Sequence, residues 1–246
     1  MVEVLLDRGS VCENYRSLLF AQLIMPRELC QERTFFRYDA EMVSASRKTP
    51  AKRSEARERL LATASELFYA EGINSVGVDR IVAASNVTLA TFYRHFPSKQ
   101  DLVVSYLASI HDVLVERAGA VAKRAQGRDL IAEIGAEVVA EIGHEGYRGC
   151  AFINAASEFE DPNSPVRRVV GDHRRWFYER VRRAFADAGH EYPANPARHF
   201  VMLRDGAVTA AYLDSSTAAQ RTFKRGVDGL LRSIDMEILP HGGDGS

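Results

Sequence analysis

The chain has 246 residues, of which 46% are hydrophobic and 26% charged, the proportions of an ordinary globular protein. This length predicts one or two compact units with a real core and excludes a miniprotein that depends on disulfides. The 32 basic and 33 acidic residues give a formal net charge of −1, so any surface for a polyanion must be local.

The sequence shows no pattern typical of a membrane span, a secretory signal, a disulfide framework or a zinc cluster. Its apolar stretches fall short of the ~18–20 residues that cross a bilayer, and residues 1–8 do not read as a secretory signal, so we expect a cytoplasmic protein without a membrane partner. Cys12, Cys30 and Cys150 have no CxxC spacing, which argues against a disulfide framework and a zinc cluster. We expect reduced thiols, no metal and no cofactor.

Four regions follow from composition and periodicity. Residues 1–46 lack a sustained period, and Met42 precedes a polar, basic stretch. We therefore expect 1–46 to be a disordered appendage or a mis-assigned start. Residues 47–101 have the pattern of a small helical head, residues 102–239 that of a larger helical body, and residues 240–246 that of a flexible tail.

The head begins with a strongly predicted amphipathic helix. Leu60, Ala64 and Phe68 recur at helical spacing after Ser54, and Gly72 is a typical helix end.

Two short helices joined by the turn at residues 85–87 follow, which is the pattern of a helix-turn-helix. Thr88 is the expected N-cap of the second short helix, and residues 98–101 predict a capping box that opens a longer helix. Periodicity groups three side chains on one face of the second short helix: Leu89, Phe92 and Phe96.

Beyond residue 120 the periodic segments are all helical, with no strand alternation and no internal repeat. Gly, Pro and Asn residues separate them. The expected helices span residues 129–142, 149–160, 165–188, 196–214 and 217–235. The predicted fold is all-α, with a small three-helix head on a larger helical body.

A tyrosine in the second short helix is followed by an aromatic residue, a proline, a polar residue and a lysine. These residues are Tyr93, Phe96, Pro97, Ser98 and Lys99. Over about residues 54–106 this pattern resembles the TetR/AcrR family of transcriptional regulators, and from there to residue 239 the resemblance is architectural. It implies a body that senses a ligand and dimerises. By analogy it also implies four DNA contacts, namely Thr91, Tyr93, His95 and Lys99.

Two positions depart from the family pattern. Asn86 stands where the family usually has a turn glycine, and Gly77 where it usually has a Ser or Thr cap. Asn tolerates left-handed backbone better than other non-glycine residues, and Gly is an acceptable N-cap. The departures put the rigidity of the turn in question, not the fold.

The chemistry of the second short helix fits DNA. A helix of two turns can enter the major groove, where its first side chains face base edges. These are Thr88, Leu89, Ala90 and Thr91. Tyr93, Arg94 and His95 lie on the outer face, fitted for phosphates or, for Arg94, a guanine. Lys99, at a helix N-terminus, is expected on a phosphate.

Charge favours the same surface. Residues 47–101 hold nine bases and six acids, a net +3, which leaves −4 for the remainder of the chain. A basic arm precedes the first helix and is expected to follow the DNA backbone or minor groove; it consists of Arg47, Lys48, Lys52 and Arg53. The alternative is a helix-turn-helix shape that packs without binding DNA.

The last two predicted helices carry apolar stripes with small residues, which favours a four-helix dimer interface. The expected interface residues are Phe200, Ala207, Ala211, Phe223, Val227 and Leu230. The alternative is that these stripes only fill the core of one chain.

A pocket for a small, mostly apolar molecule is expected among the middle helices. Its candidate residues are Tyr106, Cys150, Phe152, Asn154, Trp176 and Tyr212. Arg174 or Arg175 is a further candidate for an anionic ligand. The helix after Cys150 fits a solvated surface equally well. Cys150 has two alternative interpretations, a redox or electrophile sensor and a buried, inert thiol. A sensor needs a cation beside the sulfur, and Arg148 is the one Lys, Arg or His that the sequence fixes next to Cys150.

The sequence therefore predicts a ligand-responsive transcriptional regulator. We expect a repressor that binds a palindromic DNA operator as a homodimer and is released by a small-molecule effector. The alternatives are a ligand-independent architectural DNA-binding protein and, behind it, a helical enzyme. The enzyme hypothesis lacks a GxSxG, P-loop or GxGxxG motif, and His144-Glu145 and His190-Glu191 lack the second histidine of a helical zinc site.

Overall fold

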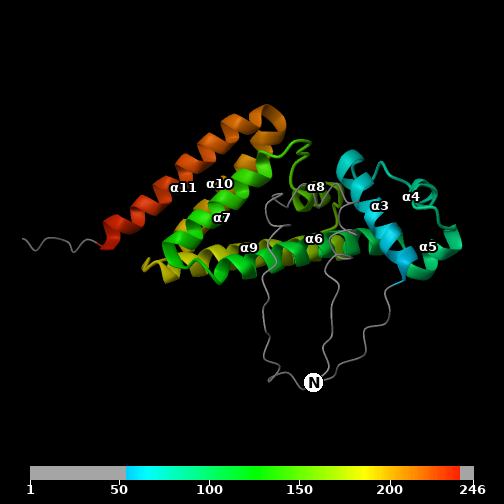
Figure 1. Cartoon of the computed structure of the whole chain (residues 1–246), viewed down its shortest axis with the longest axis horizontal. Coiled ribbons are helices and arrows are strands. Elements are labelled where there is room, and N and C mark those ends of the chain that lie inside the picture. The colour runs from blue at the N-terminus through cyan, green and yellow to red at the C-terminus, as the bar shows by residue number, and fades with distance from the viewer. Residues whose placement is uncertain (1–53, 239–246) are drawn as a thin grey trace, which may run out of the picture. The chain divides into compact units, whose positions relative to one another are not determined.

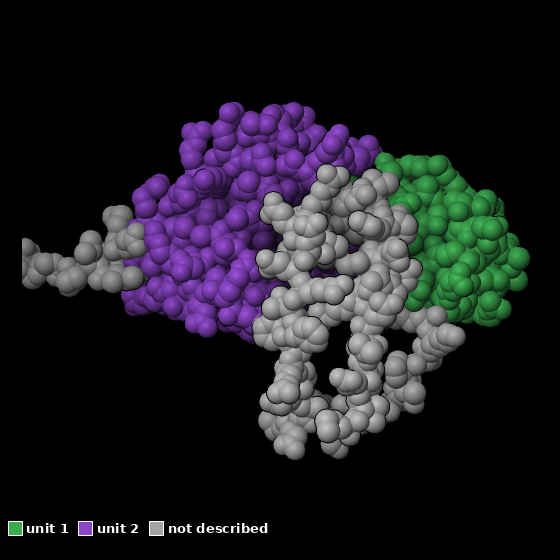
Figure 2. All heavy atoms as spheres, in the orientation of Figure 1, with its two compact units in different colours: residues 1–102 green, residues 103–246 purple. Residues whose placement is uncertain are grey.

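The computed structural model of the chain describes residues 54–238, with side chains described for 54–234 (Figure 1). These residues form helices and connecting turns, without a strand, which confirms the predicted all-α class. The chain divides into two compact units, residues 1–102 and 103–246 (Figure 2). The predictions for residues 1–46, for Arg53 with the rest of its basic arm, and for residues 240–246 lie outside the described part.

The first unit contains helices α3 (Glu55–Glu71), α4 (Val78–Ala84) and α5 (Leu89–His95), and α3 packs against both short helices. The core of this head consists of apolar side chains from all three. They include Leu60, Ala64 and Phe68 from α3, Ile81 from α4, and Phe92 and Phe96 around α5. The guanidinium of Arg57 lies 4.9 Å from the centroid of the Phe96 ring and covers it.

Side-chain caps define the start of α5 and of the helix after it. The Thr88 hydroxyl accepts a hydrogen bond from the Thr91 backbone N–H at 3.1 Å, which satisfies one free donor of the first turn of α5. The Ser98 hydroxyl accepts from the Asp101 N–H at 3.1 Å and donates to the Asp101 carboxylate at 2.7 Å. Both predicted caps are confirmed.

The turn between α4 and α5 depends on Asn86. Its φ of 51° lies in the left-handed region, and it is the one described non-glycine residue with a positive φ. The buried Ser85 hydroxyl closes the preceding turn by donating to the Ile81 carbonyl at 2.7 Å. Gly77 precedes α4 without a side-chain cap. Asn86 thus meets the backbone requirement that the family pattern usually gives to glycine.

The second unit is a helical body. Helix α6 (Lys99–Ala122) begins before the boundary between the units, and α7 (Gly127–Ile142), α8 (Ala151–Glu158), α9 (Pro165–Asp187), α10 (Ala194–Ala210) and α11 (Ser216–Ile238) follow it. Helix α9 contacts α7, α8 and α10, and α11 contacts α7 and α10 (Figure 1). A π-helical turn, η2 (Ala211–Ser215), directly joins α10 to α11. The helix predicted over residues 196–214 includes most of this segment, so the prediction did not anticipate the π-helical turn.

Glycines allow the body helices to approach closely. A Cβ on Gly226 of α11 would lie 2.9 Å from a methyl carbon of Leu203 on α10, and one on Gly135 of α7 would lie 3.2 Å from Val227 on α11. The Gln220 amide donates to the Val139 carbonyl at 2.8 Å and adds a polar link between α11 and α7. Helix α11 is therefore fixed against two neighbours at once.

The left-handed turn gives a test of the head. Asn86→Val should lower the free energy of unfolding by about 1–2 kcal/mol, because a β-branched side chain is strained at this φ. Asn86→Gly should be neutral or stabilising by about 0.5 kcal/mol, since glycine adopts this conformation freely. Urea titration followed by circular dichroism measures both, and equal stabilities of the two variants would contradict the assignment.

Candidate functional sites

The recognition helix α5 has one buried and one open side. Phe92 is fully buried, whereas Leu89 is 44% exposed and Tyr93 51% exposed, and Thr88 and Ala90 are open as well. The interpretation that grouped Leu89 with Phe92 and Phe96 is therefore wrong. The first turn of α5 presents small and apolar side chains at a width that a DNA major groove admits.

Several of the predicted DNA contacts also have partners inside the head. The Thr91 hydroxyl lies 2.9 Å from that of Thr88, and the His95 Nε2 lies 3.2 Å from the hydroxyl of Ser54, at the start of α3. Arg94 is exposed, and the Lys99 ammonium lies 6.0 Å from the centroid of the Phe68 ring. Thr91 and His95 thus help to position α5 and its contact with α3, whether or not they touch DNA.

Some of the basic side chains of the head are paired with carboxylates of the head itself. Arg59 pairs with Glu55 at 2.7 Å, and Arg80 reaches both oxygens of Glu71 at 2.5 and 2.6 Å. Residues 54–101 hold five bases and six acids, a net of −1. The +3 of residues 47–101 therefore comes entirely from the four bases at residues 47–53, in the arm that precedes the described part.

Comparison with known proteins identifies this arrangement. Residues 60–106, which include α4 and α5, match the family model of the bacterial regulatory proteins of the tetR family. A TetR-family transcriptional regulator from Streptomyces coelicolor is 42% identical in sequence, with a TM-score of 0.71 over 73% of this chain and 96% of that one. The chain belongs to the TetR family of transcriptional regulators. Its head is the DNA-binding helix-turn-helix of that family.

Other relatives are less similar in sequence. The regulator SrpR of Pseudomonas putida is 36% identical over 64 residues, which are 26% of this chain and 30% of SrpR. The chain thus aligns with less than a third of that curated relative. A TetR regulator from Streptomyces avermitilis has a TM-score of 0.66 over 74% of this chain and 99% of its own, but at 24% identity it supports the fold alone.

An aromatic and imidazole cluster lies in the body of the TetR fold. His173 of α9 is buried, stacks on Phe152 of α8 with ring centroids 3.6 Å apart, and lies 3.1 Å from His111 of α6, Nδ1 to Nδ1. The Trp176 ring meets the His111 ring edge to face at 5.1 Å. Phe152 and Trp176, both predicted pocket residues, thus pack against His173, and Trp176 also packs against His111.

The other predicted pocket residues lie in different surroundings. Tyr106 is buried, and the Asn154 amide donates to the Arg148 carbonyl at 2.9 Å. Tyr212 is half exposed on η2, with the Arg148 guanidinium 6.0 Å from its ring centroid. Cys150 is buried next to Arg204 of α10. The candidate set is therefore divided among several sites.

Both arginines that were candidates for binding an anionic ligand form ion pairs with carboxylates of the protein. Arg174 pairs with Asp205 at 2.5 Å and Arg175 with Asp172 at 2.9 Å. The buried cation is instead Arg204, which the sequence analysis missed. Its position four residues after Phe200 and four before Val208, both buried, is the signal that could have revealed it.

The surroundings of His173 keep its imidazole neutral. Burial, then the positive charge of Arg204, then His111, lower the pKa of His173 from 6.5 to about 3. The Nδ1 atoms of His173 and His111, 3.1 Å apart, form a hydrogen bond when one ring donates and the other accepts. Sequence analysis missed both histidines, although His173 falls on the buried stripe of α9 that includes Val166 and Val181.

An apolar groove of about 790 Å³ follows α10 and α11. Ala207, Phe223 and Leu230, all predicted interface residues, line it together with Met202 and Leu203. The remaining predicted interface residues fall elsewhere. Phe200 and Val227 are buried within one chain, where the Phe200 and Phe223 rings pack edge to face at 5.6 Å, and Ala211 begins η2.

Membrane and metal features were also sought in the described part of the chain. Among residues 54–238, no helix combines the length and apolar composition that a membrane crossing needs. The same residues contain no group of three or more His, Cys, Asp or Glu side chains placed to hold a metal ion.

The DNA contacts predicted on the head are of two kinds, those that position the protein on phosphates and those that read bases. Lys99→Ala should weaken binding to all DNA sequences and reduce the slope of log K against log salt by about 0.9 per subunit, since one phosphate contact is lost. Tyr93→Phe should also weaken binding uniformly, because it removes only the hydroxyl and keeps the edge-to-face packing on Phe92. Thr91→Ala should cost about 1–3 kcal/mol more on the cognate site than on random DNA.

Fluorescence anisotropy at several salt concentrations measures these effects. Lys123→Ala is the matched control, because it removes an exposed lysine of the body and should leave binding unchanged. If Thr91→Ala weakened cognate and random DNA equally, its contribution would be the cap with Thr88 alone and base reading by Thr91 would be wrong.

The depressed pKa of His173 predicts an acid-sensitive fold. Below pH 6.5 the unfolded chain binds a proton at His173. The folded chain does not bind it there, because the pKa of His173 is about 3 in the folded state. This contribution to stability is complete above pH 6.5 and is lost as the pH falls toward 3, at about 1.4 kcal/mol per pH unit. Urea titrations at pH 6.5 and 5 should differ by about 2 kcal/mol more in the wild type than in His173→Phe. The same change in unfolding free energy with pH in the wild type and in His173→Phe would contradict this role of His173.

Proposed function

We propose that this TetR-family protein is a ligand-responsive repressor that binds a palindromic operator as a homodimer. The observation that carries the proposal is the two-sided recognition helix. Phe92 fixes α5 in the head, while Thr88, Leu89 and Ala90 remain open to base edges and Tyr93 to a phosphate. Because such a regulator acts on DNA, we place it in the cytoplasm.

Binding through one head is expected to be weak. Helix α5 has seven residues and the described head is not positively charged, so little surface and few phosphate contacts are available per chain. Two heads bound to an inverted repeat double the contact surface and the number of phosphate contacts. The arm at residues 47–53 supplies four further bases for the backbone.

The groove on α10 and α11 supports dimerisation. It is apolar, and Met202 at its edge is largely exposed. Gly206 and Gly226 line the groove without a side chain, which leaves room for a helix to approach closely. A second copy related by a twofold axis is the occupant that fits, because each chain offers the same two helices and would form a four-helix interface.

Two glycine substitutions test the dimer. A Cβ on Gly206 meets nothing within 4 Å, so Gly206→Glu adds a charge to the groove without a clash inside one chain. It should shift the protein from dimer to monomer in sedimentation velocity, with at least a tenfold weaker dimer. Gly171→Glu is the matched control: its position on α9 is equally open, lies outside the groove, and should leave the dimer intact. A wild-type monomer at micromolar concentration would contradict the proposal.

The body is proposed to sense a small, mostly apolar molecule. Two helices suffice for the dimer, and the cluster of His111, Phe152, His173 and Trp176 combines aromatic area with hydrogen-bonding nitrogens from three helices. By linkage, an effector that weakens DNA binding must bind the free protein more tightly by the same factor.

The single tryptophan makes this testable. Small molecules that raise the melting temperature of the free protein should change the fluorescence of Trp176, the one Trp of the chain, and should weaken operator binding in gel shifts. Operator DNA should weaken their binding by the same factor. If every stabilising compound left DNA affinity unchanged, the protein would instead be a ligand-independent DNA-binding protein.

A further inference from the structure

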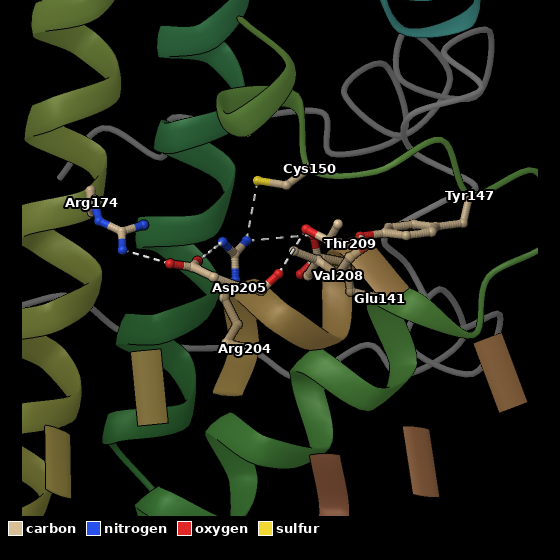
Figure 3. Close-up of polar contacts among 8 residues, drawn as sticks. All are labelled: Glu141, Tyr147, Cys150, Arg174, Arg204, Asp205, Val208 and Thr209. Atoms are coloured by element: carbon tan, nitrogen blue, oxygen red, sulfur yellow. Dashed lines mark hydrogen bonds and ion pairs between the residues drawn. The ribbon is translucent and has the colours of Figure 1, made fainter. Parts of the chain in front are cut away.

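Cys150 and Arg204 form a buried pair in the body, from segments 54 residues apart. The Arg204 Nη2 donates to the Cys150 sulfur at 3.3 Å (Figure 3). Cys150 is 4% exposed and Arg204 9% exposed. Cys150 is the residue before α8, and Arg204 projects from α10, so tertiary packing brings the cation to the sulfur.

The sulfur is the nearest acceptor to this guanidinium. The carboxylate of Asp205 lies 3.4 Å from Arg204, and that of Glu141 lies 3.8 Å away. Asp205 is also held by Arg174 at 2.5 Å, which offsets its charge (Figure 3). Burial alone would lower the pKa of Arg204, but Cys150, Glu141 and Asp205 together raise it above its ordinary value. Arg204 is therefore a buried cation whose nearest polar partner is the sulfur of Cys150.

We propose that Cys150 is a site of oxidation by a small hydroperoxide, with Arg204 as the group that activates it. The reacting form of a cysteine is the thiolate, and a guanidinium at hydrogen-bond distance stabilises that anion. This pair supplies the cation that the sequence alone did not place beside Cys150. The proposal is independent of the effector and of the operator, because it concerns only the body.

The reaction balances with hydrogen peroxide as the oxidant. The sulfur attacks one peroxide oxygen, the S–O bond forms as the O–O bond breaks, and the other oxygen leaves as hydroxide and takes up the proton of the thiol to become water. Sulfur is oxidised to a sulfenic acid and the peroxide is reduced. Arg204 donates to the charge that develops on the leaving oxygen.

Burial makes the site selective by size. A sulfur with 4% exposure is closed to bulky reagents, whereas hydrogen peroxide is close to water in size. The segment before Cys150 contains Gly146 and Gly149, both at positive φ. The sulfenic oxygen would stand between Cys150 and Arg204 and alter the link between the start of α8 and α10.

The first test compares folded and unfolded protein. Cys12→Ser and Cys30→Ser leave Cys150 as the one thiol of the chain. Folded protein and protein in concentrated urea are exposed to hydrogen peroxide at the same pH, catalase then removes the peroxide, and dimedone is added to both samples in urea so that it reaches the sulfur. Mass spectrometry should show that Cys150 is oxidised about tenfold faster in the folded protein, because only the fold supplies Arg204. A buried, inert thiol reacts more slowly when folded, and that result would overturn the proposal.

The second test varies the cation in the same background. Arg204→Met should lower the labelling rate about tenfold, and Arg204→Lys should retain more of it because a charge remains. Arg174→Met is the matched control, since it also removes a partner of Asp205 but does not contact Cys150 in the structure. Circular dichroism checks that each variant is folded. Equal labelling of the Arg204→Met and Arg174→Met variants would overturn the role of Arg204.

Discussion

The anchoring of α5 by Phe92 and Phe96 is the interaction on which the DNA-binding head depends. A helix of seven residues is far below the ~12–15 residues at which isolated helices become stable in water, so its structure must come from packing and caps. Burial of one such aromatic side chain contributes about 1.5–3 kcal/mol. Thr88 closes the first turn, and Asn86 sets the angle at which the chain enters it. The open side of α5 is defined only because its opposite side is fixed.

Most of the head could be predicted because its signals are local. The caps at Thr88 and Ser98 and the helix end at Gly72 each depend on residues within one turn, and the structure has them where the sequence indicated. Leu89 was misplaced because a two-turn helix offers too few residues for a period to separate buried from open positions. The direct passage from α10 through η2 into α11 was missed for the opposite reason, since helical periodicity continues through a π-helical turn.

The polar centre of the body could not be predicted, because its partners are distant in sequence. Arg204 meets Cys150 across 54 residues, and His111 meets His173 across 62. A periodic pattern shows that Arg204 and His173 fall on buried stripes but not what they touch. Their chemistry differs: His173 avoids the cost of a buried charge by staying neutral, whereas Arg204 keeps its charge and needs acceptors around it. These buried groups, with Trp176 beside them, give the body a chemical character beyond that of a dimerisation scaffold.

The central claim is that two copies of one short recognition helix read DNA as a pair. The most direct measurement is selection of binding sites from random duplex DNA by the full chain, followed by sequencing. The account predicts an inverted repeat whose half-site centres lie about 10 base pairs, or a multiple of that, apart. Enrichment of a single asymmetric half-site, or of no sequence at all, would contradict it.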